Sequence, residues 1–255
     1  MPVITHGGVS ILNAIPLGLG SSCAVDLSVE VEASFGRQEP GSALVDTITG
    51  YFSKRSGRDV SVKVRSDLPR GGGLKSSSAV AAGAVSALAA ITGLEVDVPV
   101  LAAKLSIEAG VSVTGALDDV AASLYGGISV CDNTKMKILK RDPFPEGYRF
   151  VLLPRGPRRN FDPDLLRRRW PAFKSISTLL YSGNYIEAMS RNGLSVSQAL
   201  GYETDILLRA VELGAKASGV SGNGPSLFAL VKEGDEGPIM DLFSPMGTPI
   251  IRRPI

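Results

Sequence analysis

A glycine-rich segment followed by a lysine and three serines is the stretch of this sequence whose residue types are best suited to chemistry. Its residues are Pro69, Arg70, Gly71, Gly72, Gly73, Leu74, Lys75, Ser76, Ser77, Ser78 and Ala79. Glycines let a backbone adopt positive φ and approach a ligand closely, and a serine can cap the helix that Ala79 to Leu88 would continue. The free amides and the positive dipole end at such a helix start are suited to binding phosphate.

A plain glycine-rich turn that caps an alanine-rich helix would explain the glycines alone. The lysine and the hydroxyls add a cation and oxygen ligands for magnesium in the same place, which favours a phosphate site. No glycine-lysine-serine sequence ends the segment, as it would in a Walker A loop, and the helix lacks the glycine spacing of a dinucleotide-binding fold. A different family of phosphate loops is therefore indicated.

Three acidic residues further along the chain could act beside a bound phosphate. Asp118 and Asp119 begin a predicted helix, where they could simply cap it and complement its dipole. Near a phosphate loop, one of them could orient or deprotonate an alcohol while the other holds magnesium. Glu108 lies near the end of a mostly apolar helical pattern, where its charge opposes the helix dipole. We therefore expect a cation near it, either magnesium or a lysine or arginine.

The second half of the chain has two further polar features. The segment Lys216 to Ser226 is rich in glycine and hydroxyls, and it could serve a shared anionic ligand or only connect a helix to a strand. An arginine cluster precedes it and consists of Arg155, Arg158, Arg159, Arg167, Arg168 and Arg169. Spacing alone leaves open a solvated helix face, an RNA-binding face, or bidentate contacts from one or two arginines to a carboxylate or phosphate.

Composition limits the classes of protein and partner. The 255 residues suffice for one large or two modest domains, and 44% hydrophobic with 20% charged residues is typical of a globular protein. A net charge of +2 is too small to favour nucleic acid or an anionic membrane as a partner. Cys23 and Cys131 lie in apolar surroundings and His6 is the only histidine. We expect buried free thiols in a reducing cytoplasm, and neither a histidine metal site nor a Ser-His-Asp triad.

Two stretches bear on membranes and secretion. The first residues, MPVITHGG, have neither the basic start nor the following apolar run of a secretory leader, so none is expected. Residues 76–94 carry no charge over nineteen residues, which is the length of a membrane span. This stretch is rich in alanine, serine and glycine, and it therefore predicts a small-residue helix packed in a protein core.

Apolar patterns predict the elements that position these groups. Strands are expected on either side of a loop at Gly18 to Ser22 within residues 9–31, and at residues 60–64, 128–131, 135–139, 148–153 and 226–231. Helices are expected at residues 44–53, 79–88, 99–110, 118–125, 165–182, 185–194, 205–213 and 238–243. Two prolines and a glycine in Arg141 to Gly147 mark the best boundary, which predicts domains at residues 1–143 and 144–255. Strands and helices do not alternate regularly, which favours an α+β fold.

Segment 69–79 resembles the phosphate-loop motif of the GHMP kinases, the superfamily of galactokinase, homoserine kinase and mevalonate kinase. The form GLKSSSA is similar to the archaeal shikimate kinases within that superfamily. Residues 12–15 (LNAI) with residues 18–22 (GLGSS) resemble the first motif of this branch, and residues 219–226 (GVSGNGPS) resemble the third. The resemblance therefore covers nearly the whole chain.

The resemblance implies roles for single residues. Asp119 stands eleven residues after Glu108, a spacing similar to that between the magnesium-binding glutamate and the catalytic aspartate of mevalonate kinase. By that similarity, Asp119 is the base or orienting group, and Glu108 and Ser77 are magnesium ligands. Contacts to the substrate are expected from Asp118, Arg155, Ser221 and Gly222.

One departure concerns the cation of the site. The first-motif lysine that pairs with the catalytic aspartate in mevalonate kinase has no counterpart here, because Leu19 stands where this branch often has a lysine. Lys75 could replace it as the cation beside the transferring phosphoryl group.

The resemblance implies a two-lobed fold, with an N-terminal lobe like the second domain of ribosomal protein S5 and a ferredoxin-like C-terminal lobe. ATP and Mg²⁺ would lie in the cleft between the lobes, and the γ-phosphoryl group would pass to a hydroxyl of shikimate. Two alternatives stay open: a homoserine kinase or other small-molecule kinase of the same superfamily, and a non-catalytic nucleotide-binding regulatory protein.

Overall fold

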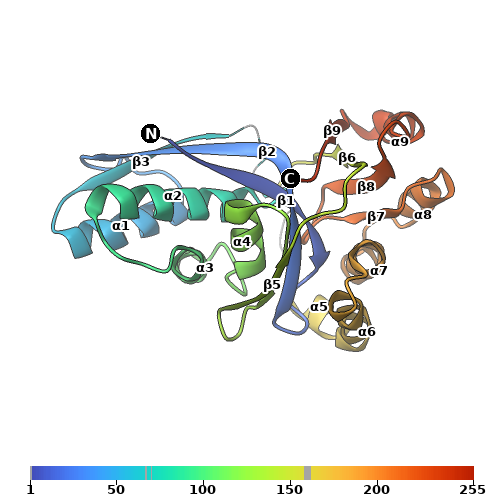
Figure 1. Ribbon diagram of the computed structural model, residues 1–255, viewed down its shortest axis with the longest axis horizontal. Coiled ribbons are helices and arrows are strands. Elements are labelled where there is room, and N and C mark those ends of the chain that lie inside the picture. The colour runs from blue at the N-terminus through green and yellow to red at the C-terminus, as the bar shows by residue number, and fades with distance from the viewer. Residues whose placement is uncertain (1, 67, 70, 158–161) are drawn as a thin grey trace.

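Two antiparallel sheets, one from each half of the chain, organise the protein (Figure 1). The computed structural model describes residues 2–66, 68–69, 71–157 and 162–255. The first sheet contains β1 (Val3–Leu12), β2 (Leu19–Phe35), β3 (Val60–Ser66), β4 (Ile128–Asp132) and β5 (Lys137–Asp142). Its helices are α1 (Ala43–Ser56), α2 (Ser76–Thr92), α3 (Val98–Glu108) and α4 (Leu117–Tyr125).

Strand β2 is the central strand of the first sheet because it is long enough to pair with three others. Its first residues, Leu19–Cys23, pair with β4, its last, Val29–Phe35, pair with β3, and β1 runs antiparallel along it. The strand alternates buried and more exposed side chains over much of its length. Helices α2 and α4 pack against β1 and β2, so both helices are held by the same two strands.

The second sheet has the strand order β7-β8-β6-β9. Its strands are β6 (Tyr148–Leu153), β7 (Ala217–Val220), β8 (Leu227–Lys232) and β9 (Ile250–Arg252). Its helices are α5 (Asp164–Arg167), α6 (Trp170–Tyr181), α7 (Tyr185–Leu200), α8 (Asp205–Glu212) and α9 (Gly237–Phe243), followed by a 3₁₀ helix at Ser244–Met246. Helices connect β6 to β7 and β8 to β9, while β7 and β8 form a hairpin. This is the split βαβ arrangement of ferredoxin-like domains, so the expected α+β class and lobe type are confirmed.

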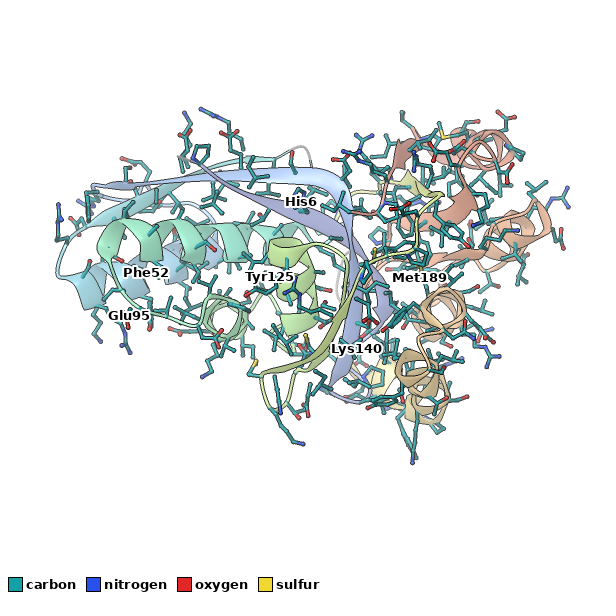
Figure 2. All side chains as sticks on the ribbon, viewed as in Figure 1. His6, Phe52, Glu95, Tyr125, Lys140 and Met189 are labelled. Atoms are coloured by element: carbon teal, nitrogen blue, oxygen red, sulfur yellow. The ribbon has the colours of Figure 1, made fainter. Side chains whose placement is uncertain are left out.

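Buried apolar side chains from both sheets join in one large core. Figure 2 marks a buried side chain in each half, Phe52 on α1 and Met189 on α7, and neither is exposed to solvent. Helix α7 also packs against β1, which brings the C-terminal helices beside the N-terminal strands. Because the halves share this packing, the cleft residues from the two halves are held in a fixed relation.

Four details differ from the sequence prediction. The predicted loop at Gly18–Ser22 is wrong, because Leu19–Cys23 pair with β4 and the turn lies earlier, at residues 13–18. Strands β7 and β9 were not predicted, since each is short and glycine or proline stands beside it. The single helix expected at residues 165–182 is divided into α5 and α6. No serine caps α2: its N-cap is Lys75, which makes no side-chain capping bond.

The predicted division into residues 1–143 and 144–255 falls between β5 and β6, and it stays a prediction. The final residues return to the first sheet, where Pro254 bridges to Val25 and the Ile255 amide donates to the Ala24 carbonyl. The predicted free, buried state of Cys23 and Cys131 is confirmed. Among the helices of the described residues, none has the length and apolar character needed to cross a membrane.

A close backbone contact between α7 and β7 predicts the effect of one substitution. A Cβ on Gly193 would overlap the Cα of Gly219, so Gly193→Ala should lower the free energy of unfolding by about 1–3 kcal/mol. Gly50 in α1 is the matched control, since a Cβ there meets nothing, and Gly50→Ala should raise stability by about 0.5–1 kcal/mol. Urea unfolding of both variants measures the two shifts, and equal shifts would contradict the proposed steric origin.

Candidate active site

A cleft of about 380 Å³ brings together the glycine-rich segments from both halves of the chain. One wall is formed by Gly71, Gly73 and residues 75–78 of the phosphate loop and helix α2. Other parts come from the end of β1 and its turn, from residues 110–114, from the start of α4, and from residues 222–224. The arrangement therefore brings together residues as far apart in sequence as Ser10 and Gly224.

The phosphate loop ends in a left-handed residue that directs α2 at the cleft. Gly71 and Gly73 have positive φ values of 69° and 91°, and Lys75 has a φ of 69° as the N-cap. A lysine in this region is strained by roughly 1–3 kcal/mol. The left-handed conformation of Lys75 starts α2 at Ser76, so Ser76, Ser77 and Ser78 form the first helical turn, where amides have no intrahelical partner. These amides and hydroxyls line the cleft, as a phosphate site requires.

Hydrogen bonds join the phosphate loop to the glycine-rich turn of the C-terminal half. The Ser221 hydroxyl donates to the Gly73 carbonyl at 2.8 Å, and the Gly222 amide donates to Ser10 Oγ at 3.2 Å. A Cβ on Gly73 would overlap the Ser221 carbonyl oxygen, so only glycine permits this approach. The two glycine-rich segments consequently form one continuous surface.

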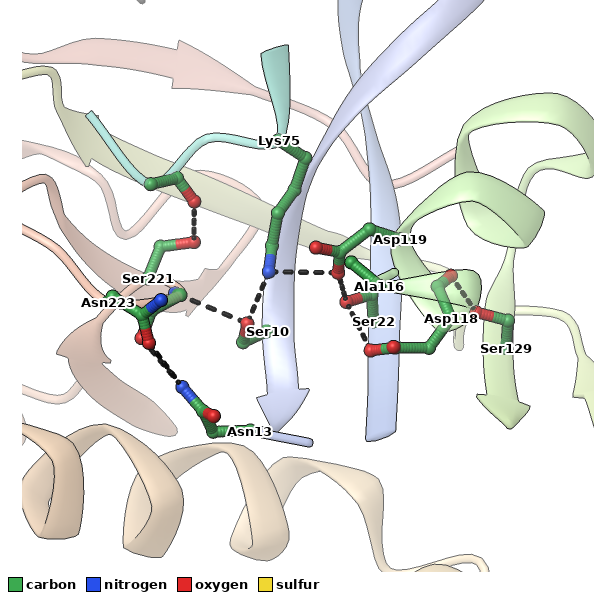
Figure 3. Close-up of polar contacts among 12 residues, drawn as sticks. Ser10, Asn13, Ser22, Lys75, Ala116, Asp118, Asp119, Ser129, Ser221 and Asn223 are labelled. Atoms are coloured by element: carbon green, nitrogen blue, oxygen red, sulfur yellow. Dashed lines mark hydrogen bonds and ion pairs between the residues drawn. The ribbon is translucent and has the colours of Figure 1, made fainter. Parts of the chain in front are cut away.

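Lys75 and Asp119 form an ion pair inside the cleft, at 2.9 Å between Nζ and Oδ1 (Figure 3). Their side chains are only 8% and 12% exposed. The Lys75 ammonium also donates to Ser10 Oγ at 2.6 Å, and the Ser22 hydroxyl donates to Asp119 Oδ1. Among the described residues that line the cleft, Lys75 is the single basic one. It therefore carries the positive charge that the cleft wall offers.

Asp118 lies beside this pair and is more deeply buried, with 3% of its surface exposed. Its Oδ2 lies 3.2 Å from Ser22 Oγ, and its Oδ1 accepts from Asn133 Nδ2 at 3.1 Å. A Cβ on Gly20 would overlap the carboxyl group, so the strand backbone packs directly against it. Burial, and then the charge of Asp119, raise the pKa of Asp118 to about 7.

The structure brings together most of the predicted site residues. Lys75, Ser77, Asp118, Asp119 and Gly222 line the cleft, and Ser221 is bonded to its wall. Pro69 and Leu74 flank the loop glycines, Gly72 accepts from the Ser226 amide through its carbonyl, and Ala79 continues α2.

Two predicted residues lie apart from the cleft lining. Glu108 is exposed at the end of α3, and the cleft is lined by Ser106 before it and by residues 110–114 after it. The Arg155 guanidinium donates to Met246 Sδ at 3.3 Å and does not line the cleft. Within the arginine cluster, Arg167 pairs with Asp164, and Arg169 donates to Gln198.

Three predicted residues lie outside the described residues: Arg70 of the loop, and Arg158 and Arg159 of the arginine cluster.

Sequence analysis missed three residues that contact the lysine and the two aspartates of the site. Ser10 contacts Lys75, Ser22 contacts both aspartates, and Asn133 contacts Asp118. Ser22 stood in a segment that resembles a family motif, and Asn133 directly follows a predicted strand. Their roles depend on strand pairing, which the spacing of residues alone did not indicate.

Known proteins share part of this sequence and the overall fold. Residues 43–127 match the GHMP kinases N terminal domain family. A solved homoserine kinase from Cytophaga hutchinsonii superposes with a TM-score of 0.72 at 20% identity, covering 99% of this chain and 95% of that one. The fold is thus that of the GHMP kinases.

Curated relatives narrow the family. A shikimate kinase from Methanothermobacter thermautotrophicus is 33% identical, covering 94% of this chain and 90% of that protein. A shikimate kinase from Archaeoglobus fulgidus is 32% identical, covering 96% of this chain and 89% of that protein. The chain belongs to this archaeal shikimate kinase family of the GHMP superfamily.

The buried carboxyl group predicts a pH-dependent difference in stability. The pKa of Asp118 is raised from 3.8 to about 7 in the folded state, so between these pH values the folded protein keeps a proton that the unfolded chain loses, and stability falls as pH rises. Asp118→Asn cannot ionise, so its stability relative to the native protein should increase from about pH 4 to about pH 7 and then stay constant. Urea unfolding across this range measures the difference, with Asp235→Asn at an exposed position as the control. If the stability difference between Asp118→Asn and the native protein did not change with pH, the pKa of Asp118 would not be raised in the folded state.

Proposed function

We propose that this protein phosphorylates a hydroxyl of shikimate with ATP, giving shikimate 3-phosphate and ADP. The observation that carries the chemistry is the buried Lys75–Asp119 ion pair at the start of the phosphate-loop helix. The choice of shikimate as the substrate rests on the names of the curated relatives. A soluble biosynthetic kinase of this kind would act in the cytoplasm, where thiols such as Cys23 and Cys131 stay reduced.

Binding of ATP rests on the loop and on helix α2. The amides of residues 76–78 and the dipole of α2 would hold the phosphates, and the hydroxyls of the same residues would add hydrogen bonds. Residues 71–73 would let the backbone approach the phosphates closely. Catalysis of phosphoryl transfer depends chiefly on such positioning and on charge stabilisation.

Asp119 is the group placed to act on the acceptor alcohol. Its Oδ1 already accepts from Lys75 and Ser22, whereas no described residue donates to its Oδ2. The substrate hydroxyl would donate to Oδ2 and attack the γ-phosphorus in line. A bond forms between the substrate oxygen and phosphorus, the bond from the γ-phosphorus to the bridging oxygen breaks, and the hydroxyl proton passes to Asp119. Lys75 would offset the negative charge on the transferring group.

The residues present fit a magnesium ion that is held mainly by nucleotide phosphates. Mg²⁺ commonly binds proteins through only one or two side chains, keeping waters and substrate phosphates as its other ligands. Ser77 in the cleft would supply an oxygen ligand. Glu108, the other predicted ligand, is exposed at the end of α3 outside the cleft lining and stays a prediction. The ion would neutralise phosphate charge during transfer.

Replacing Asp119 tests its role. Asp119→Asn should lower kcat by about a hundredfold or more while changing ATP affinity little, because the amide cannot take up a proton. Steady-state kinetics and calorimetric titration with a non-hydrolysable ATP analogue measure the two effects, with Asp235→Asn as the control. A kcat equal to that of the native protein would exclude Asp119 as the base.

The substrate is tested by offering alternatives separately. ADP production from MgATP should occur with shikimate and not with homoserine or mevalonate. Turnover with homoserine would agree with the fold and the phosphate site but would show that shikimate is the wrong substrate. Absence of turnover with all three would favour a nucleotide-binding regulatory protein.

A further inference from the structure

One hydroxyl group lies between two carboxyl groups in the cleft. Ser22 Oγ is within hydrogen-bond distance of Asp118 Oδ2 and of Asp119 Oδ1, and Figure 3 shows it between the two side chains. A hydroxyl has one proton, so it can donate to only one of these oxygens at a time. Asp119 forms the ion pair with Lys75 and therefore accepts as a carboxylate, so the Ser22 proton is donated to it. If Asp118 were ionised, its Oδ2 would face the lone pairs of Ser22.

The other oxygen of Asp118 has a defined partner. Asn133 Oδ1 accepts from the Leu117 amide at 2.6 Å, which fixes the orientation of the Asn133 side-chain amide. Asn133 Nδ2 is therefore the atom that faces Asp118 Oδ1, and it can only donate. This leaves Oδ2 as the oxygen that could carry a proton and donate it to Ser22.

The charges around Asp118 favour a neutral group. Lys75 is the single basic residue among the described residues of the cleft lining, and it is already paired with Asp119. Asp118 is packed against the Gly20 backbone and is almost wholly buried, where an unpaired second negative charge is unfavourable. The titratable groups that act on Asp118 are Asp119 on the same helix and Lys75 at the start of α2. The thiol of Cys131 on β4 also lies near, and its pKa is raised chiefly by burial.

We propose that Asp118 carries a proton on Oδ2 and donates it to Ser22, whose hydroxyl in turn donates to Asp119 Oδ1. Asp118 and Ser22 are then positioning residues that act through Asp119, and this role rests on the proposed function of Asp119 as the base. The raised pKa of Asp118 agrees with this arrangement.

The chain of hydrogen bonds has a consequence for the reaction. Asp119 Oδ1 is occupied by Ser22 and Lys75, so Asp119 presents Oδ2 to the acceptor hydroxyl. With Asp118 neutral, Asp119 is the one ionised carboxylate among the described residues of the cleft lining, and Asp118 adds no charge that repels the incoming phosphates. Ionisation of Asp118 as the pH rises above its pKa would reverse both effects and lower kcat.

An infrared measurement tests the proton without any need for activity. A protonated carboxyl group has a C=O stretching band that a carboxylate lacks. At pH 6 the spectrum of the native protein minus that of Asp118→Asn should contain this band, and it should disappear as the pH is raised above that of half-ionisation. The difference spectrum against Asp235→Asn should lack it. A native protein without the band at pH 6 would overturn the proposal, whether or not the protein is a kinase.

Kinetics test the positioning role. An asparagine can accept from Asn133 and donate to Ser22 just as a protonated aspartate does, so Asp118→Asn should lower kcat by less than about threefold and remove the alkaline decline of kcat. Asp118→Leu, which breaks both bonds, should lower kcat at least about tenfold with little change in the KM for ATP. Ser22→Ala should behave like Asp118→Leu, and Ser22→Thr should restore most of the rate.

The outcomes separate the two proposals. Thermal unfolding first confirms that each variant is folded. If Asp118→Asn loses as much activity as Asp119→Asn, an ionised Asp118 is required and the proton assignment is wrong. If Asp119→Asn retains full activity while the infrared band is present, the proposed function of Asp119 fails and the proton assignment holds.

Discussion

The ion pair between Lys75 and Asp119 is the interaction on which the site depends. It joins the start of α2 to the start of α4 inside the cleft, where neither side chain is well solvated. A buried ion pair is favourable only when its geometry is good and when further hydrogen bonds satisfy the partners. Ser10 and Ser22 supply those bonds, one on the ammonium and one on the carboxylate. Strands β1 and β2 therefore supply the hydroxyls that orient Lys75 at the start of α2 and Asp119 in α4 toward each other.

The cation of the cleft comes from the phosphate loop and not from the first two strands. Leu19 at the start of β2 is apolar, and the lysine of the cleft comes from the phosphate loop instead. A left-handed backbone at Lys75 turns the side chain toward Asp119 rather than out into solvent. One positive charge thus serves both the carboxylate and the site where phosphates would lie. Because Lys75 is the single basic residue among the described residues of the cleft lining and is paired with Asp119, Asp118 is best accommodated as a neutral acid.

Local patterns in the sequence were sufficient to predict most helices and strands, whereas the type of each lobe came from the family resemblance. The strand alternation and the helix spacings gave the order of elements, and the motif at residues 69–79 led to the family. The short strands β7 and β9 were missed because their stability comes from pairing with β8 and β6 and not from their own residues. In the site, Asp119 and Lys75 were predicted, but Ser22 and Asn133 were not. Their contacts arise where β2 and β4 pair, more than a hundred residues apart in sequence.

The bonds between the phosphate loop and the turn at residues 221–224 have a consequence for ligand affinity. The Ser221 hydroxyl bonds to Gly73 and the Gly222 amide bonds to Ser10, so the two walls of the cleft are joined by bonds that form as the protein folds. The loss of conformational entropy needed to shape the site then belongs to folding and not to binding. Nucleotide binding and global stability are linked for this reason. A core substitution far from the cleft that loosens either sheet would lower the fraction of molecules able to bind nucleotide, and the apparent nucleotide affinity would fall.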